Sequence, residues 1–325
     1  MDSTKRSNKK KKKIIFSLAK LLVSATFIVW VVYKVKWTEV FFYLGQIKIW
    51  HIFIYTFFVI CGIIISAHKW KMLSDYKGIK LPFGDFFKYY LTGTFINNFM
   101  PSFIGGDTFR AYQIGKPDKK YMEAASTVLI DRLTGFVGAT ILVIIFSLLN
   151  LKTILKNDLL LFIDSLVLLS LFFDIFLATA RRFSFWEKMH NLLPKKLSDL
   201  IRELDHYNHN SKILLRSIGW SMLFALVGVA LSNYVLFLSL GVKIGILDYL
   251  SVIFLISIVS AIPISINNIG IKEWAFVTFF GFFGVDPSIV IAIAIISRFL
   301  QMLLSFLALP VYLESKVKEV IPFEE

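Results

Sequence analysis

Two interrupted apolar segments organise this chain: Thr92–Arg110 reads TGTFINNFMPSFIGGDTFR, and Ala261–Trp274 reads AIPISINNIGIKEW. Both contain an Asn-Asn pair, a proline, glycine and an acidic residue among apolar side chains. Proline and glycine break helices, so each segment is predicted to consist of two short helices joined by a break. The shared residues also predict an internal repeat.

The composition around these segments is that of a membrane protein. The chain has 325 residues, of which 57% are hydrophobic and 18% are charged, and its mean hydropathy is +0.70. A soluble domain has about 45–50% apolar and about 25% charged residues. The class is therefore an all-α polytopic integral membrane protein, which excludes soluble enzyme folds and disordered or fibrous chains.

Full membrane crossings are predicted wherever about 20 consecutive residues are mainly apolar. The sequence contains six such stretches: Ile14–Tyr33, Trp50–Ala67, Ala124–Leu149, Leu159–Ala180, Ile218–Leu240 and Ile289–Leu313.

The distribution of basic residues predicts on which side of the membrane each loop lies. Lys and Arg concentrate in residues 1–13 and in the loops 68–85, 110–122 and 181–216, whereas the intervening connections carry few. Basic loops stay on the cytoplasmic side. We therefore expect both tails, residues 1–13 and 314–325, to lie in the cytoplasm of a multi-pass cell-membrane protein. Residues 14–313 are expected to form a single transmembrane domain.

The two interrupted segments do not fit this scheme as crossings, because both flanks of each lie on one side. Residues 86–109 begin and end at basic loops, whereas residues 249–284 begin and end on the opposite side. We interpret them as re-entrant hairpins in an inverted repeat; kinked pairs of spans are the alternative. Interrupted helices at corresponding positions of two inverted halves indicate a transporter's substrate site. We expect their Asn pairs to meet near the bilayer midplane.

The first segment carries a candidate phosphate-binding group. Gly105 and Gly106 let backbone amides approach a headgroup, and Arg110 is able to bind a phosphate with two parallel hydrogen bonds. In the alternative interpretation the glycines only permit the turn, and Asp107 pairs with Arg110.

Further charges lie in apolar surroundings, where an unpaired charge costs ~3 kcal/mol or more. Asp131 and Arg132 are adjacent in a predicted helix, point about 100° apart, and so need partners on other helices. One cavity in which Asp107, Asp131, Arg132, Glu273 and Arg298 surround a lipid headgroup satisfies this need; interhelical ion pairs that only hold the bundle also satisfy it. The expected headgroup site comprises Asn97, Asn98, Pro101, Gly105, Gly106, Asp107, Arg110, Asp131, Arg132, Asn267, Asn268, Gly270, Lys272, Glu273 and Arg298.

Motifs of soluble chemistry are missing from the sequence. Asp205 and His209 are one helical turn apart in a basic loop, but without further ligands a solvated helix face explains them. There is no nucleotide-binding glycine loop and no nucleophile elbow. We expect no catalytic residue, metal or cofactor. The basic run Lys9–Lys13 is expected to bind anionic lipid, with RNA as the alternative and no DNA partner.

The quoted residues resemble a known family. Asn97–Ser102 followed by Gly105–Arg110 is similar to the signature of the lysylphosphatidylglycerol synthase transmembrane region family. Asp131-Arg132-Leu133, Gly270–Glu273 and Arg298 also fall where that family has its marks, and Ala67–Lys71 resembles its second-helix end, with Lys in place of the usual arginine. The resemblance covers residues 14–313.

The resemblance implies a flippase for lipids. In bifunctional members this region translocates aminoacylated phosphatidylglycerol, and a separate cytoplasmic domain transfers lysine from lysyl-tRNA. The chain stops at Glu325, so no synthase domain is expected within it.

The leading hypothesis is a translocase for an anionic, aminoacylated or polyprenyl-phosphate-linked lipid, with a separate transferase as a partner. The alternatives are a phosphatidylglycerol lysyltransferase, for which tRNA is a partner, a membrane component of a glycolipid-synthesising complex, and a non-catalytic scaffold.

Overall fold

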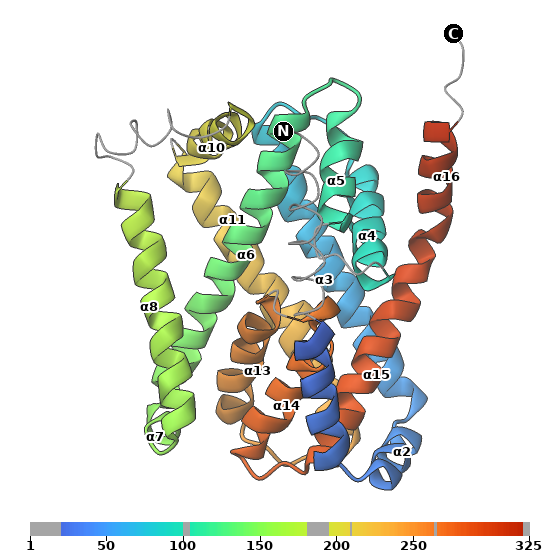
Figure 1. Ribbon diagram of the computed structural model, residues 1–325, viewed down its shortest axis with the longest axis vertical. Helices are drawn as coiled ribbons and strands as arrows, with labels where there is room; N and C mark the ends of the chain where they lie inside the picture. The colour runs from blue at the N-terminus through green and yellow to red at the C-terminus, as the bar shows by residue number, and fades with distance from the viewer. Residues whose placement is uncertain (1–20, 100–104, 181–194, 209, 263–264, 321–325) are drawn as a thin grey trace, which may run out of the picture.

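The computed structural model describes residues 21–99, 105–180, 195–208, 210–262 and 265–320 (Figure 1). Within these ranges the chain is helical and contains no strand, which confirms the all-α class.

The helices fall on either side of residues 181–194 in the sequence. The first part contains a helix over Leu21–Lys34, α2 (Trp37–Gln46), α3 (Ile49–Tyr76), α4 (Phe83–Phe99), α5 (Gly105–Gly115), α6 (Tyr121–Leu149), α7 (Leu151–Ile154) and α8 (Asp158–Ala180). The second part contains α10 (Lys195–Asn208), α11 (Ser211–Phe224), the π-helix η1 (Ala225–Leu231), α12 (Ser232–Ser239), α13 (Ile246–Ala261), η2 (Ile266–Asn268), α14 (Ile271–Gly281), α15 (Pro287–Ser305), η3 (Phe306–Ala308) and α16 (Leu309–Val320).

Several helices have the length and composition of membrane crossings. Among the described residues four qualify: Ile49–Tyr76, Tyr121–Leu149, Ser211–Ser239 and Pro287–Glu314. A fifth qualifies if Leu21–Lys34 and α2, bent by 84°, count as one span. A multi-pass membrane protein is therefore confirmed. The predicted crossing Leu159–Ala180 coincides with α8, Ile14–Tyr33 begins outside the described residues, and the count of six stays a prediction.

The interrupted segments form two pairs of short helices at opposite ends of the bundle. Helices α4 and α5, of 17 and 11 residues, pack together in the upper half of Figure 1, whereas α13 and α14, of 16 and 11 residues, pack together in the lower half. A helix rises about 1.5 Å per residue, so none of the four is long enough for a crossing. α4 ends at Phe99 and α5 begins at Gly105, whereas α13 ends at Ala261 and α14 begins at Ile271 with η2 between them. Pro101 and Pro263 lie outside the described residues. An inverted repeat stays a prediction.

Helix α13 lies at the centre of the apolar core. Its residues Val252, Ile253, Phe254 and Leu255 are all buried, although they point in four directions around the helix. A helix that is apolar on every side is surrounded by other helices. α13 packs against both α6 and α14, and it therefore joins the two parts of the chain.

Small residues let two of the long helices approach each other. Gly62 of α3 faces Gly228 of η1, and a Cβ on Gly62 would lie 2.7 Å from the Gly228 Cα. Close backbone contact of this kind is typical of membrane helices. It fixes the π-helix against α3.

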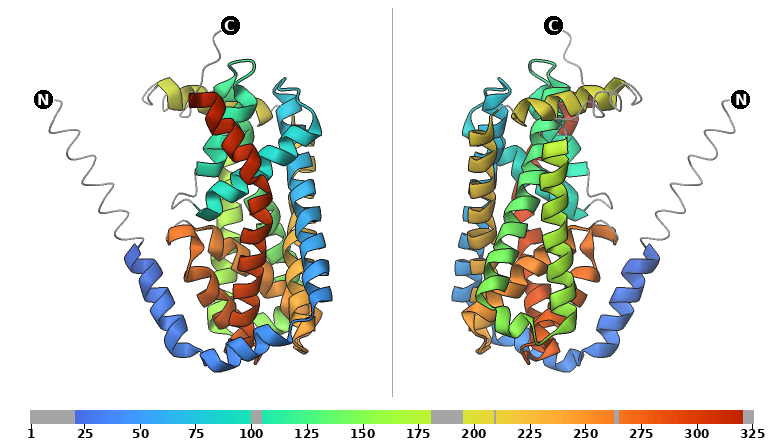
Figure 2. Two further views of the ribbon diagram at one scale, coloured as in Figure 1. Left: turned by 90° about the vertical axis from the view of Figure 1, so that its right-hand side faces the viewer. Right: turned by 90° about the vertical axis from the view of Figure 1, so that its left-hand side faces the viewer.

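The helix over Leu21–Lys34 leans away from the bundle, and α2 runs along the lower end of the bundle (Figure 2). The helix touches the second interrupted segment, because the Phe27 and Trp274 rings lie 5.5 Å apart. Gly270 completes this contact: its φ is +89°, and a Cβ there would lie 2.7 Å from the Phe27 Cβ.

Candidate functional site

A buried ion cluster joins α3, α5 and α6. Asp131 of α6 is 4% exposed and binds two cations: its Oδ1 lies 2.9 Å from Lys69 Nζ, and its Oδ2 accepts a 2.8 Å hydrogen bond from Arg110 Nη2. Lys69 also donates to the Asp131 carbonyl and to Ser221 Oγ, at 2.8 and 2.9 Å. Arg110 lies between the Trp70 and Tyr90 rings, 4.2 and 4.3 Å from their centroids.

Asp107 completes this cluster on its outer side. Arg132 binds it with two parallel hydrogen bonds, Nε to Oδ2 at 2.9 Å and Nη2 to Oδ1 at 3.0 Å. Arg110 Nη1 is 3.5 Å from Asp107 Oδ1, so Asp107 belongs mainly to Arg132. Lys69, Asp107, Arg110, Asp131 and Arg132 are called the ion cluster below; they hold α5 against α3 and α6.

Gly106 and Asn97 hold α4 and α5 together. Gly106 N–H donates to Asn97 Oδ1 at 2.9 Å, and a Cβ on Gly106 would collide with the Gly93 carbonyl oxygen. Gly105 is the first residue of α5. In this pair of helices, glycine permits close contact and Asn97 satisfies an amide at the start of α5.

A second ion pair holds the other interrupted segment. Glu273 Oε1 accepts hydrogen bonds from Arg298 Nε and Nη2, at 3.1 and 2.8 Å, and Glu273 Oε2 accepts one from Gly270 N–H at 2.8 Å. Arg298 also donates to the carbonyl oxygens of Asn267 and Asn268, at 3.2 and 3.4 Å. These two residues have φ of 50° and 55°, a left-handed conformation that Asn tolerates better than most residues.

The two Asn pairs meet. Asn267 Nδ2 donates a 3.1 Å hydrogen bond to the carbonyl oxygen of Asn98, and Asn98 Nδ2 donates to Ser305 Oγ at 3.2 Å. The end of α4, the turn η2 and the end of α15 are therefore in contact, although they are far apart in the sequence.

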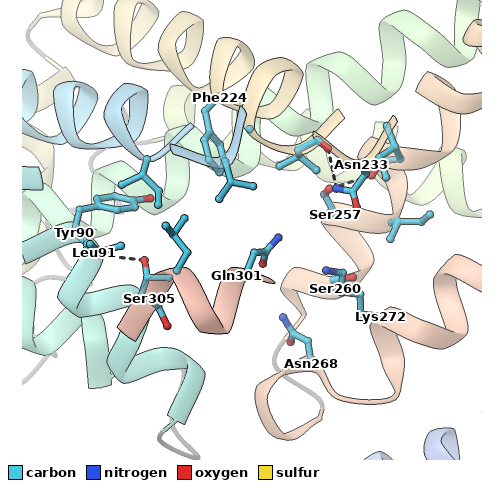
Figure 3. A pocket seen from close by; sticks show the side chains of 18 of the residues that line it. Tyr90, Leu91, Phe224, Asn233, Ser257, Ser260, Asn268, Lys272, Gln301 and Ser305 are labelled. Carbon is cyan, nitrogen blue, oxygen red and sulfur yellow. Dashed lines mark hydrogen bonds between the residues drawn. The ribbon is translucent and has the colours of Figure 1, made fainter. Parts of the chain in front are cut away.

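A cavity of about 330 Å³ lies beside this contact (Figure 3). Its wall is formed by residues of α3, α4, α11, η1, α12, α13, η2, α14 and α15. Most of the wall is apolar, but Asn233, Ser257, Ser260, Lys272 and Asn268 lie together on one side, opposite Tyr90 and Leu91 (Figure 3).

Polar atoms in this wall lack partners. Asn233 Oδ1, Ser260 Oγ and Asn268 Oδ1 are buried, and among the described residues none of them has a hydrogen-bond partner. A buried polar group without a partner costs about 1–3 kcal/mol. These atoms are therefore available to a polar molecule in the cavity.

The charged residues expected to surround one headgroup are divided between two groups. Asp107, Asp131 and Arg132 belong to the ion cluster, whereas Glu273 and Arg298 bind each other. The charges are divided because each carboxylate pairs with a cation in its own part of the bundle. Of the residues proposed from the sequence, Asn268 and Lys272 line the cavity, and Pro101 lies outside the described residues.

Sequence reasoning missed several polar residues of the cavity wall. Asn233, Ser257, Ser260 and Gln301 were not proposed, although each interrupts an apolar stretch. A search for every polar residue inside such stretches, rather than for charges alone, would have found them. Lys69 was assigned to a basic loop, but it is 6% exposed and lies within the ion cluster.

Helix α10 is held to the end of α3. Lys77 Nζ lies 2.7 Å from Glu203 Oε2 and 3.0 Å from His206 Nδ1. Tyr207 donates to the Leu73 carbonyl at 2.9 Å, and burial raises the pKa of its hydroxyl above the usual value. No group of three metal-ligating side chains occurs among the described residues; His209, proposed with Asp205, lies outside them.

Comparison with known proteins finds similarity over most of the chain. The profile described as Lysylphosphatidylglycerol synthase TM region matches residues 17–308. The UPF0104 membrane protein MJ1595 of Methanocaldococcus jannaschii is 23% identical over 265 residues, which cover 76% of this chain and 78% of that protein. A UPF0104 membrane protein of Methanothermobacter thermautotrophicus is 24% identical over 256 residues, which cover 72% and 75%. The chain thus belongs to the lysylphosphatidylglycerol synthase transmembrane region family.

Proposed function

We propose that this protein binds the headgroup of a membrane lipid in the cavity between its two interrupted segments and moves that lipid between leaflets. The observation that carries this proposal is the cavity wall, where buried polar atoms without partners lie inside a membrane domain. A lipid headgroup is polar and is attached to chains that remain in the hydrocarbon. It supplies the missing hydrogen bonds without requiring the whole ligand to leave the bilayer.

The two interrupted segments support a carrier rather than a static binding site. Transporters bind their substrates at broken helices where two halves of the fold meet, and they work by moving one half against the other. Here the two interrupted segments touch through Asn267 and Asn98, in a hydrogen bond between one side chain and one backbone carbonyl. We infer that this contact breaks and re-forms as the cavity opens to alternate sides.

The substrate class follows from the shared chemistry of the candidates. Anionic phospholipids, aminoacylated phospholipids such as lysylphosphatidylglycerol, and polyprenyl-phosphate lipids all carry a phosphate. The family description names the lysylated lipid, which supports a relation to this group. We further propose a cell-membrane location with both termini in the cytoplasm, and a separate transferase as a partner.

Reconstitution tests the proposal. Full-length protein in vesicles of phosphatidylcholine and phosphatidylglycerol should speed the exchange of fluorescent phosphatidylglycerol between leaflets, compared with protein-free vesicles. Ser260→Leu fills the cavity and should remove most of this exchange. The matched control is Ser165→Leu, the same substitution at an exposed position of α8, which should exchange lipid at the unmodified rate. Equal rates for both variants would contradict the cavity as the lipid path.

A further inference from the structure

Among the described residues that line the cavity, one is charged, Lys272. It is the second residue of α14, is half-buried, and lines the cavity wall. Its Nζ lies 5.7 Å from the centre of the Phe276 ring. Among the described residues no carboxylate or carbonyl is bound to this ammonium group.

The nearest carboxylate in the sequence is already occupied. Glu273 follows Lys272, but one of its oxygens binds the Arg298 guanidinium and the other accepts from Gly270 N–H. Arg298 therefore cancels the charge of Glu273. Among the described residues, no ion pair balances the positive charge of Lys272.

The remaining polar wall is neutral. Among the described residues, those that line the cavity include asparagine, glutamine, serine, threonine and tyrosine but no aspartate or glutamate. The wall as a whole thus carries one positive charge. Charges interact strongly where water is scarce, so the sign of this wall matters for whatever enters.

Two asparagines present acceptor atoms to the cavity. Asn233 Nδ2 donates a 2.8 Å hydrogen bond to the Val229 carbonyl within the π-helix. Asn233 Oδ1 and Asn268 Oδ1 are buried, and neither has a partner in the part of the chain that the structure describes. The wall therefore combines one cationic donor, Lys272, with neutral acceptors, and this set matches a phosphate next to hydroxyl groups. A volume of about 330 Å³ is near the lower end of ligand pockets, roughly 300–1,000 Å³, and suits a single small headgroup.

We propose that the cavity selects lipids with an anionic, hydroxyl-bearing phosphate headgroup and discriminates against headgroups that carry an added amino cation. This inference rests on the proposed function, and it narrows the substrate class to phosphatidylglycerol-like lipids rather than their lysyl esters. Lys272 binds the phosphate, and the asparagine oxygens accept from the hydroxyls. A lysyl group brings two ammonium charges into a wall that is already positive, and no carboxylate there receives them.

Competition binding tests this selection. Full-length purified protein in detergent is loaded with fluorescent phosphatidylglycerol, which is then displaced by unlabelled phosphatidylglycerol, lysylphosphatidylglycerol or phosphatidylcholine. Phosphatidylglycerol should displace the probe at a concentration at least about tenfold lower than the lysyl ester, because Lys272 repels the lysyl ammonium groups.

Three variants assign the preference to the cavity. Lys272→Gln should abolish it, Lys272→Arg should keep it, and Asn233→Asp should shift it toward the lysyl ester, because the new carboxylate offsets Lys272. Lys243→Gln is the matched control, since Lys243 is exposed on the loop before α13. Size-exclusion profiles check that each variant is folded. If Lys272→Gln does not fold, Asn233→Asp still tests the selection.

The outcomes separate the two proposals. If the lysyl ester displaces the probe as well as phosphatidylglycerol does, or if Asn233→Asp leaves the ranking unchanged, the charge selection is wrong although lipid binding stands. If no lipid displaces the probe, or the probe does not bind at all, lipid binding in the cavity fails and the selection fails with it.

Discussion

Asp131 lies between Lys69 and Arg110, and at the residue scale this arrangement determines what each charge of the ion cluster contributes. Arg110 is 3% exposed, whereas the Arg132 side chain is 49% exposed. Removing Arg110 takes a cation from the buried Asp131 and from its place between two aromatic rings, and breaking a buried pair costs about 3–5 kcal/mol. Removing Arg132 leaves Asp107, which is 19% exposed and still lies 3.5 Å from Arg110, so the cost is smaller.

Arg110→Gln should therefore lower the thermal unfolding temperature of the purified protein far more than Arg132→Gln does. Arg216→Gln, at an exposed position of α11, is the control and should leave the temperature unchanged. Equal losses for Arg110→Gln and Arg132→Gln would mean that burial does not set the strength of these pairs.

Gly270 provides a second test at this scale. Gly270→Ala places a Cβ 2.7 Å from the Phe27 Cβ on a backbone with φ +89°, so the free energy of unfolding should fall by more than about 1 kcal/mol. Gly281→Ala is the matched control: it has open space and lies within α14, so the same substitution should be neutral or stabilising. Denaturant titration of both variants measures the difference; a neutral Gly270→Ala would show that the N-terminal helix does not pack on this turn.

At the scale of the helices, the apolar stretches predicted most of the long elements, because about 20 apolar residues have few other solutions in a membrane. The residues at which these helices begin and end were less predictable. The crossing predicted over Trp50–Ala67 is part of a longer helix, α3, which ends at Tyr76. The helix continues past Lys69 because Asp131 pairs with this lysine inside the protein, so its charge does not need water. The partner of each charge depends on how helices rotate against each other, which one sequence does not specify. The π-helix η1 also has no signal of its own in the sequence.

Helix α10 gives a prediction at this scale. Lys77→Met removes the ammonium group that binds Glu203 and His206, so α10 should separate from α3 and exchange its amide hydrogens faster. The amides of α13 should exchange as before. Lys71→Met is the control, because it removes a lysine near the end of α3 whose partner, Asp75, lies one turn away on the same helix. Unchanged exchange in α10 after Lys77→Met would indicate that aromatic packing alone holds this helix.

For the molecule as a whole, the meeting of the two Asn pairs is the feature on which a carrier mechanism depends. Cysteines at positions 98 and 267, in a background with Cys61→Ser, should be joined by a short bis-methanethiosulfonate cross-linker, because Asn267 Nδ2 lies 3.1 Å from the Asn98 carbonyl. The cross-linked protein should lose lipid exchange in vesicles, and reduction should restore it. Either single cysteine variant serves as the control. Full exchange by the cross-linked protein would exclude relative movement of the two segments as the transport step.

The burial of α13 on every side also has a consequence for biosynthesis. Ribosomes complete the residues of α6 long before those of α13, yet the two helices pack together in the finished protein. Until Ala261 has left the ribosome and entered the bilayer, α6 lacks the helix that covers it in the finished protein. The core is therefore completed only when the last quarter of the chain, from α13 onward, has been made, and we expect that the first part of the chain does not mature alone.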